Sequence, residues 1–250
     1  MYPVLFTIKS IEIQSSPVFL ALAILAGVVV SWREARRVGT QDREIAKFWA
    51  AVLPFAFFIG LVNGFLFRFG VPDALQNIFS VFSSGLISFG VIVGAFLLGL
   101  LFALFQKTPA GPILDLIALP FPLMLAIYRI GCFLTGCCYG LETNSFLGMY
   151  LPGYHGEWAY RYPTQLMLII FNVILFAWLW SRRKNKPFEG SLTIAFLLVY
   201  SSGRILIDAL RDLPRVFGSF SQQQLTSIAI LLVTLYICFE LWRAKQPRQH

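Results

Sequence analysis

Residues 13–32 read IQSSPVFLALAILAGVVVSW, a run of twenty residues without one charged side chain. A helix that crosses a lipid bilayer needs about 20 mostly apolar residues, because the hydrocarbon core is about 30 Å thick. Six further uncharged runs follow along the chain, at residues 48–67, 74–106, 116–128, 162–181, 190–203 and 216–239. The fourth and sixth of the seven runs are long enough to span only if their helices continue past Arg129 and Arg204.

The overall composition agrees with a membrane protein. Hydrophobic residues make up 58% of the 250 residues and charged residues 13%, and the mean hydropathy is +0.73. A soluble domain carries roughly 45–50% apolar and about 25% charged residues. The apolar content excludes a disordered chain, and the charges are too few to cover a soluble globule. We therefore expect an all-α, polytopic membrane protein with about seven transmembrane helices, in which residues 1–250 form one integral membrane domain.

The distribution of basic residues predicts the orientation. The formal net charge is +8, from 20 lysines and arginines against 12 aspartates and glutamates. Counted from an outside N-terminus, the connections on the inner side carry most of the basic residues: Arg33, Arg36, Arg37, Arg43, Lys47, Lys107, Arg182, Arg183, Lys184, Lys186, Arg243, Lys245 and Arg248. Because cytoplasmic loops are enriched in lysine and arginine, we expect the N-terminus outside and the C-terminus in the cytoplasm. The basic excess then serves membrane anchoring, so we expect membrane lipids as partners and no nucleic acid.

The largest segment between predicted spans is 139–161, which we expect to lie outside the membrane as a small cap. It is rich in tyrosine and also contains His155 and Trp158. Two interpretations stay open for this segment. It is either an aromatic belt at the membrane interface or a cap over a site that opens toward the outer leaflet.

Two arginines interrupt predicted helices at the same depth. Arg129 follows Asp115, the expected inner end of its helix, by 14 residues, and Arg204 follows Gly190 by the same interval. At 1.5 Å per residue, each lies roughly 21 Å from the inner face of a core about 30 Å thick. An arginine in hydrocarbon costs at least a few kcal/mol, so it normally faces a cavity or a charged partner. A buried arginine–carboxylate pair, or a side chain that extends to the outer interface, is the structural alternative.

A polar stripe surrounds Arg204. Tyr200, Arg204, Asp208 and Arg211 are spaced four, four and three residues apart, which places them on one face of a helix. Asp208 can pair with Arg204, but one carboxylate cannot neutralise Arg129, Arg204 and Arg211 together. The sequence therefore predicts an anion-binding site. The natural anion at this depth is a phospholipid phosphate, which arginine binds through two parallel hydrogen bonds.

Three cysteines follow Arg129 in a stretch of small residues that reads RIGCFLTGCCYG from 129 to 140. Their spacing matches no zinc motif, because no second half follows, so we expect no metal site. In a continuous helix Cys132 and Cys137 point in different directions, which disfavours a disulfide between them. Cys132, Cys137 and Cys138 are then either small packing residues or a thiol redox site. Asn63 is also ambiguous: it forms an interhelical hydrogen bond or lines a cavity.

Four segments, in their order along the chain, resemble the prolipoprotein diacylglyceryl transferase family. They are LDLIALP at 114–120, the cysteine-containing stretch 129–140, YPTQL at 162–166 and the polar stripe within 200–212. The resemblance implies a seven-helix enzyme of the bacterial cytoplasmic (inner) membrane, and we expect no cofactor. It implies transfer of the diacylglyceryl group of phosphatidylglycerol to the lipobox cysteine thiol of a preprolipoprotein, with release of glycerol phosphate. Phosphatidylglycerol and preprolipoprotein signal peptides are therefore the expected partners.

The resemblance also assigns roles by position. Arg129 and Arg204 match the two arginines with which the family handles phosphate, and we expect them to be catalytic together with Asp208. Seven further residues are expected to bind substrate: Tyr200, Arg211, Gly140, Cys132, Thr135, Asn63 and Gln165.

The chain departs from the family pattern where protons are handled. Phe89 stands where members usually carry histidine, and Cys132 and Cys137 stand at positions that are usually asparagine and glutamate. The acceptor thiol then needs another route of activation, either the positive charge of the two arginines or Asp208 as proton acceptor. Two alternatives stay open: a catalytically impaired relative that binds phospholipid or a lipoprotein signal peptide, and a membrane thiol redox protein.

Overall fold

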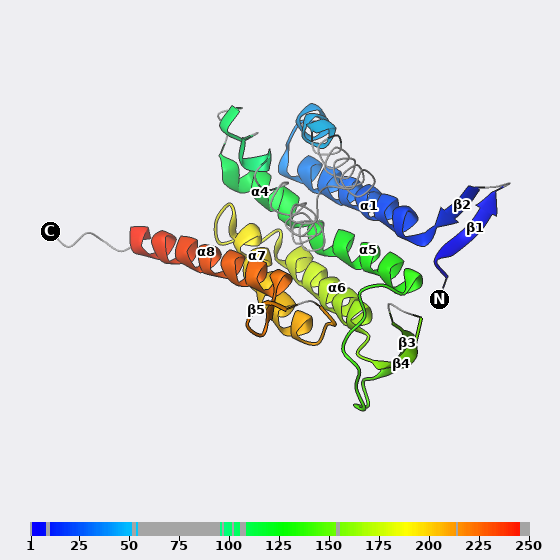
Figure 1. Cartoon of the computed structure of the whole chain (residues 1–250). Helices are drawn as coiled ribbons and strands as arrows, with labels where there is room; N and C mark the ends of the chain where they lie inside the picture. Colours follow the sequence, from blue (N-terminus) through cyan, green and yellow to red (C-terminus); the bar gives the residue numbers. More distant parts are fainter. Residues whose placement is uncertain are drawn as a thin grey trace, which may run out of the picture.

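Most of the described chain is helical. The computed structural model describes residues 2–8, 11–51, 54, 96, 98–101, 103–105, 109–153, 156–213 and 215–245 (Figure 1). The helices whose bounds lie within these ranges are α1 (Ser15–Val38), α4 (Ala110–Ala118), α5 (Phe121–Thr135), α6 (Thr164–Arg182), α7 (Ser191–Ala209) and α8 (Gln222–Lys245), and residues 42–51 are helical as well.

Five helical segments in these ranges are long and apolar enough to cross a membrane. One of the five comprises α4 and α5 together, and α1, α6, α7 and α8 account for the others. As predicted, the helices continue past Arg129 and Arg204 instead of ending before them. The predicted spans 48–67 and 74–106 lie mainly outside the described residues, so the count of seven stays a prediction.

Within the described ranges, three short antiparallel hairpins accompany the predominantly helical fold that the sequence predicted. They pair β1 (Val4–Ile8) with β2 (Ile11–Gln14), β3 (Met149–Pro152) with β4 (Trp158–Arg161), and β5 (Arg215–Phe217) with β6 (Phe220–Ser221). The first predicted span consequently begins at Ser15 and not at Ile13, because Ile13 pairs with Phe6 across the first hairpin. Backbone groups beyond the helix ends thus find partners in local strand pairs.

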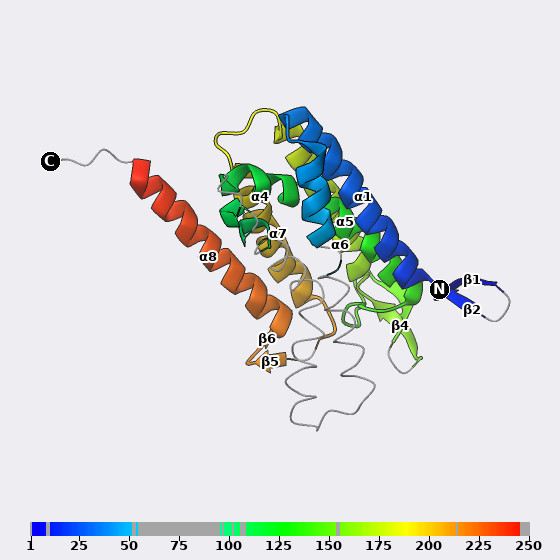
Figure 2. The same cartoon turned by 90° about the horizontal axis from the view of Figure 1, so that it is seen from above.

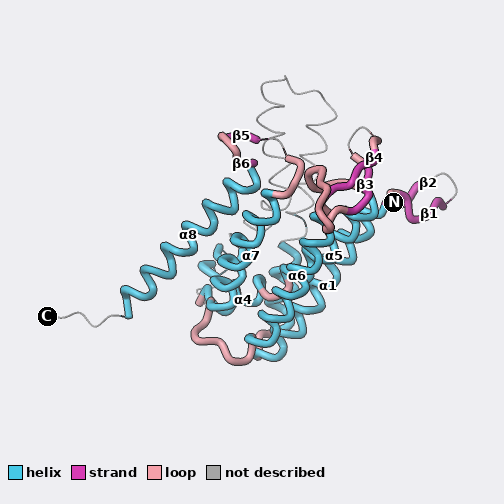
Figure 3. The backbone as a smooth tube through the Cα atoms, turned by 90° about the horizontal axis from the view of Figure 1, so that it is seen from below, coloured by secondary structure: helices cyan, strands magenta, loops and turns pink. Residues whose placement is uncertain are grey.

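The helices form a bundle whose two ends differ. Helix α5 lies between α1 and α6, and α7 contacts α4, α6 and α8. Figure 2 shows α1 and α8 on opposite sides of this bundle. Figure 3 shows all three hairpins at one end, which we call the hairpin end, and the connection from α6 to α7 at the other.

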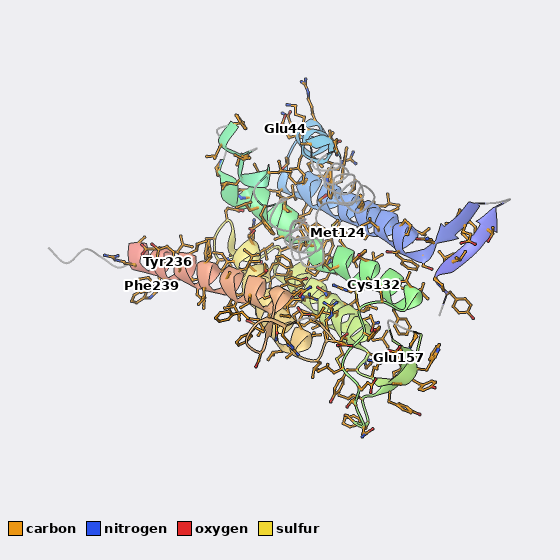
Figure 4. All side chains as sticks on the ribbon, viewed as in Figure 1. Glu44, Met124, Cys132, Glu157, Tyr236 and Phe239 are labelled. Atoms are coloured by element: carbon orange, nitrogen blue, oxygen red, sulfur yellow. The ribbon has the colours of Figure 1, made fainter. Side chains whose placement is uncertain are left out.

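The main apolar core fills the space between α4, α5, α6 and α7. Its buried members are Ile117, Ala118, Leu119, Phe121, Leu175, Leu179, Leu192, Phe196 and Tyr200. The rings of Phe121, Phe196 and Tyr200 stack in sequence, with centroids 6.0 and 5.3 Å apart. This stack leads from the core to the polar stripe of α7. On α8, by contrast, Tyr236 and Phe239 are exposed (Figure 4), as expected of a helix that faces lipid.

Candidate functional site

The polar stripe of α7 is buried and internally paired. Nη2 of Arg204 lies 2.9 Å from Oδ2 of Asp208, and Nη1 of Arg211 donates to Oδ1 of the same carboxylate at 3.2 Å. Arg204 is 1% exposed and Asp208 is fully buried, and Tyr200 and Arg211 are buried as well. The predicted single face of the helix is therefore the face turned toward the protein interior. Asp208 fixes two guanidinium groups at once.

Arg129 reaches the same region from α5. It is buried, its Nη1 lies 3.9 Å from Sγ of Cys132, and its guanidinium carbon lies 5.9 Å from the centre of the Tyr128 ring. Its charge interacts with Tyr200 and with Arg204. The two arginines that the sequence placed at one depth thus belong to a single cluster, although they come from separate helices.

The cluster carries more positive than negative charge. Three guanidinium groups, those of Arg129, Arg204 and Arg211, face one carboxylate, that of Asp208. Among the residues that the structure describes, no carboxylate forms an ion pair with Arg129. Uncompensated positive charge away from water is costly, and an anion that enters the cluster removes that cost. The cluster therefore has the excess of positive charge that binding of an anion requires.

The end of α5 folds back on itself and gathers the cysteines. Gly136 adopts a left-handed conformation at φ 76°, which ends the helix, and the N–H of Cys137 then donates to the carbonyl of Cys132 at 3.1 Å. As a result the sulfur atoms of Cys132, Cys137 and Cys138 all lie within 4.8 Å of one another. The expectation that Cys132 and Cys137 point apart is wrong, because it extended the helix through Cys137. The absence of a metal site stays a prediction.

Cys138 occupies an unusual environment. Its φ is 65°, a left-handed conformation that non-glycine residues seldom adopt. Hydrogen bonds with the thiols of Cys132 and Cys137 lower the pKa of the Cys138 thiol, and the charges of Arg129 and Arg211 lower it further. This thiol therefore ionises more readily than an ordinary cysteine.

The loop that follows α5 is held between the start of α6 and the end of α7. The N–H of Gly140 donates to the carbonyl of Tyr162 at 2.9 Å, and the N–H of Leu141 donates to that of Leu210 at 2.8 Å. A Cβ atom on Gly140 would lie 2.6 Å from Tyr162 and 2.7 Å from the carbonyl oxygen of Leu210. Only glycine fits there, so Gly140 contributes to the site by allowing three backbone segments to meet.

Side chains at the start of α6 hold the same loop. Nε2 of Gln165 donates to the carbonyl of Cys137 at 2.7 Å, and Oγ1 of Thr164 donates to that of Cys138 at 2.9 Å. Gln165 thus positions the cysteine loop, and Thr164 is a partner that the sequence reasoning missed. Thr135, at the end of α5, donates its hydroxyl to the carbonyl of Gly131 at 3.0 Å. Asn63 and Phe89 lie outside the described residues.

Another buried arginine, Arg161, ends segment 139–161 and is surrounded by three exposed carboxylates. Arg161 forms ion pairs with Glu142 at 2.7 Å, Glu157 at 3.1 Å and Asp212 at 3.7 Å, and its guanidinium lies 4.9 Å from the centre of the Tyr139 ring. Figure 4 shows Glu157 at the hairpin end, beyond Cys132. The sequence reasoning counted Arg161 only as an external charge, because two of its three carboxylates come from distant segments. In contrast to Arg129, Arg161 is fully neutralised.

Comparison with known sequences identifies the family. The family model described as prolipoprotein diacylglyceryl transferase matches residues 3–240. The chain belongs to this family.

Individual relatives agree with the family assignment. The phosphatidylglycerol–prolipoprotein diacylglyceryl transferase of Clostridioides difficile (strain 630) is 26% identical over 226 residues, which cover 90% of this chain and 89% of the relative. That of Listeria monocytogenes serotype 4a (strain HCC23) is 26% identical over 246 residues, 94% of this chain and 88% of the relative. The phosphatidylglycerol–prolipoprotein diacylglyceryl transferase 2 of Clostridium perfringens (strain 13 / Type A) is 36% identical over 159 residues, 62% of each chain. These findings confirm the resemblance and the transferase class.

The segments that carried the resemblance to prolipoprotein diacylglyceryl transferases converge in space. The stretch 129–140, the segment 162–166 and the stripe 200–212 meet through the backbone bonds around Gly140 and an isolated bridge between Gly140 and Arg211. Three of the four segments therefore lie together at the hairpin end. The fourth, 114–120, belongs to the core and to the opposite end.

Proposed function

We propose that this protein transfers the diacylglyceryl group of phosphatidylglycerol to the lipobox cysteine thiol of a preprolipoprotein and releases glycerol phosphate. The proposal rests on the buried excess of positive charge in the cluster of Arg129, Arg204, Arg211 and Asp208. A phospholipid phosphate is an anion that reaches this depth by diffusion within the bilayer. The names of the relatives supply the two substrates.

Arg129 and Arg204 bind the phosphodiester in this proposal. A guanidinium group offers a planar fork of N–H donors, which matches two phosphate oxygens. As the ester bond breaks, negative charge builds up on the departing glycerol phosphate, so the same contacts stabilise the transition state more than the substrate. Asp208 keeps the Arg204 and Arg211 side chains in place through its two oxygens. Tyr200 continues the aromatic stack beside them.

The chain crosses the bacterial inner membrane seven times in this proposal, with the hairpin end outside. The arginines at the last turn of α1 and of α6, Arg36, Arg37 and Arg182, stand at the end opposite the hairpins, which supports a cytoplasmic location of that end. Segment 139–161 then caps the site from outside. A reporter enzyme fused after Arg183 should be cytoplasmic, and one fused within the cap should be external. An external Arg183 fusion would overturn the orientation.

A transfer assay tests the reaction. The purified protein is mixed with vesicles of phosphatidylglycerol and a synthetic lipobox peptide, and the peptide is analysed for a mass increase of one diacylglyceryl group. We expect modification of the cysteine peptide and none of a peptide with serine at that position. Restoration of lipoprotein modification in transferase-depleted bacteria is the matching test in cells. Binding of lipid or peptide without modification in either test would favour the catalytically impaired relative.

A further inference from the structure

Three thiols at the hairpin end of α5 lie close enough to bind one metal ion. The sulfur atoms of Cys132, Cys137 and Cys138 are all within 4.8 Å of one another. Zinc binds thiolates at about 2.3 Å in a tetrahedral arrangement, so sulfur atoms that share one zinc ion lie about 3.8 Å apart. Each sulfur–sulfur distance therefore has to shorten by no more than about 1 Å for all three thiolates to share one ion.

The surrounding protein holds the three cysteines in this arrangement. Gln165 and Thr164, both buried, bind the carbonyl groups of Cys137 and Cys138, so the backbone of the loop is fixed from α6. Cys132 itself is 2% exposed and lies in the last turn of α5. Packing alone does not require two thiols on a loop fixed from a second helix beside a third thiol in the last turn of α5.

The charges nearby suit a thiolate site. Three thiolates and one zinc ion carry a net charge of −1. Nη1 of Arg129 lies 3.9 Å from Sγ of Cys132, so one positive charge already stands beside the sulfur atoms. The arginine also links the thiols to the cluster that is proposed to bind phosphate.

We propose that Cys132, Cys137 and Cys138 bind one Zn²⁺ ion, whose fourth position takes the acceptor cysteine thiol of the substrate; this inference rests on the proposed function. Catalytic zinc sites combine three protein ligands with one open position. A thiol that coordinates zinc is deprotonated outright, which makes it a nucleophile at neutral pH. The site thereby replaces the histidine that the family usually carries at the position of Phe89.

The chemical step balances without an oxidant or reductant. On binding zinc, the substrate thiol releases its proton to water. An electron pair of the sulfur then forms a bond to the carbon of the diacylglyceryl group that carries the phosphate ester. The bond between this carbon and the ester oxygen breaks, and its electron pair leaves with glycerol phosphate, beside Arg129. The sulfur ends as a thioether of the lipidated cysteine.

Metal binding is measured first and needs no turnover. The full-length protein is purified in detergent with a phosphine reductant, stripped of metal, and titrated with Zn²⁺ against a chromophoric chelator and with Cd²⁺ by its sulfur-to-metal charge-transfer absorption. We expect one equivalent of either ion. Cys132→Ser and Cys138→Ser should each weaken binding at least tenfold, whereas Cys238→Ser on α8 should leave it unchanged. Melting temperatures of all variants separate lost ligands from lost folding. Absence of stoichiometric binding to the wild-type protein would overturn the proposal.

The open position is tested with the substrate thiol. Addition of a lipobox peptide to the Cd²⁺-loaded protein, without phosphatidylglycerol, should increase the charge-transfer absorption by about one third, as a fourth thiolate joins three. The serine peptide should have no effect. An equal response to both peptides would overturn the role of the open position.

The two proposals fail separately. If chelation of the metal or Cys138→Ser leaves transfer at the full rate, the zinc site is wrong and the transferase function stands. If zinc and the peptide thiol bind but no diacylglyceryl group is transferred under any condition, the zinc site stands and the transferase function is wrong.

Discussion

Two buried aspartates, Asp115 on α4 and Asp208 on α7, lie in polar clusters at opposite ends of the bundle and have different surroundings. Asp115 accepts hydrogen bonds from the N–H groups of Gly190 and Thr193 at 2.9 and 3.0 Å, from the Thr193 hydroxyl at 3.1 Å and from the Lys186 ammonium at 3.2 Å. Asp115 pairs with one lysine, which also pairs with Glu189, and each of its two oxygens accepts two hydrogen bonds.

The single negative charge of Asp208 is smaller than the positive charge of the arginines around it. Its two oxygens face Arg204 and Arg211, and Arg129 adds a third positive charge from α5. The comparison shows how one residue type serves two purposes. The carboxylate of Asp115, whose hydrogen bonds are all made, holds the start of α7 against α4. In the proposed function, the carboxylate of Asp208 instead orients arginines whose remaining positive charge is available to a ligand.

Removal of the Asp208 charge should have the largest effect. Asp208→Asn leaves three buried guanidinium groups without a carboxylate, and loss of one partner of a buried ion pair costs about 3–5 kcal/mol. We expect a correspondingly lower free energy of unfolding and loss of transfer. Thermal unfolding of the purified variant and the vesicle transfer assay measure the two effects. An unchanged melting temperature would show that Asp208 does not compensate these arginines.

Substitution of the arginines should affect transfer more than folding. Arg129→Lys and Arg204→Lys keep the charge but lose the planar fork. We expect each to slow transfer roughly tenfold to a thousandfold, on the order of the roughly 3–4 kcal/mol lost with one oxyanion donor. Arg182→Lys, at the opposite end of the bundle, should transfer at the wild-type rate.

Two further measurements separate chemistry from folding in these lysine variants. The melting temperature shows whether each variant folds, and the phosphatidylglycerol that copurifies shows whether it still binds lipid. Folded, lipid-bound lysine variants with full transfer rates would refute the phosphate-binding role. Variants that fail to fold would instead show that both arginines are structural.

The sequence was sufficient to predict those features that depend only on residues close to one another along the chain. Uncharged runs predicted the helices, and the spacing of Tyr200, Arg204, Asp208 and Arg211 predicted their common face. The convergence of three cysteines was not predictable in this way, because it depends on the left-handed turn at Gly136. The neutralisation of Arg161 was not predictable either, since its partners Glu142 and Asp212 come together only in the folded chain.

Gly140→Ala should distort the backbone around the arginine cluster of Asp208. The new Cβ would lie 2.6 Å from Tyr162 and 2.7 Å from the carbonyl oxygen of Leu210, so the backbone segments on either side of Gly140 must move apart. Overpacking of this kind typically costs about 1–3 kcal/mol. We expect the free energy of unfolding to fall by this amount and the transfer rate to fall as well. Asn144→Ala, at an exposed position of the same cap, should change neither quantity measurably. A wild-type melting temperature for Gly140→Ala would show that the three segments are not tightly joined.

Asp115→Asn should have the smallest effect on function. The amide keeps one oxygen, which can accept from the N–H group and the hydroxyl of Thr193, but its NH₂ group replaces the oxygen that accepts from the N–H group of Gly190 and from Lys186. Loss of satisfied buried hydrogen bonds costs about 1–3 kcal/mol, so the melting temperature should fall. Lys186 still pairs with Glu189, which limits the loss. Because the Asp115 cluster lies at the end opposite the arginines, the transfer rate per folded molecule should stay at the wild-type value. A slower transfer rate in a fully folded variant would show that the two ends of the bundle are coupled. The distinction between a structural and a functional aspartate would then be wrong.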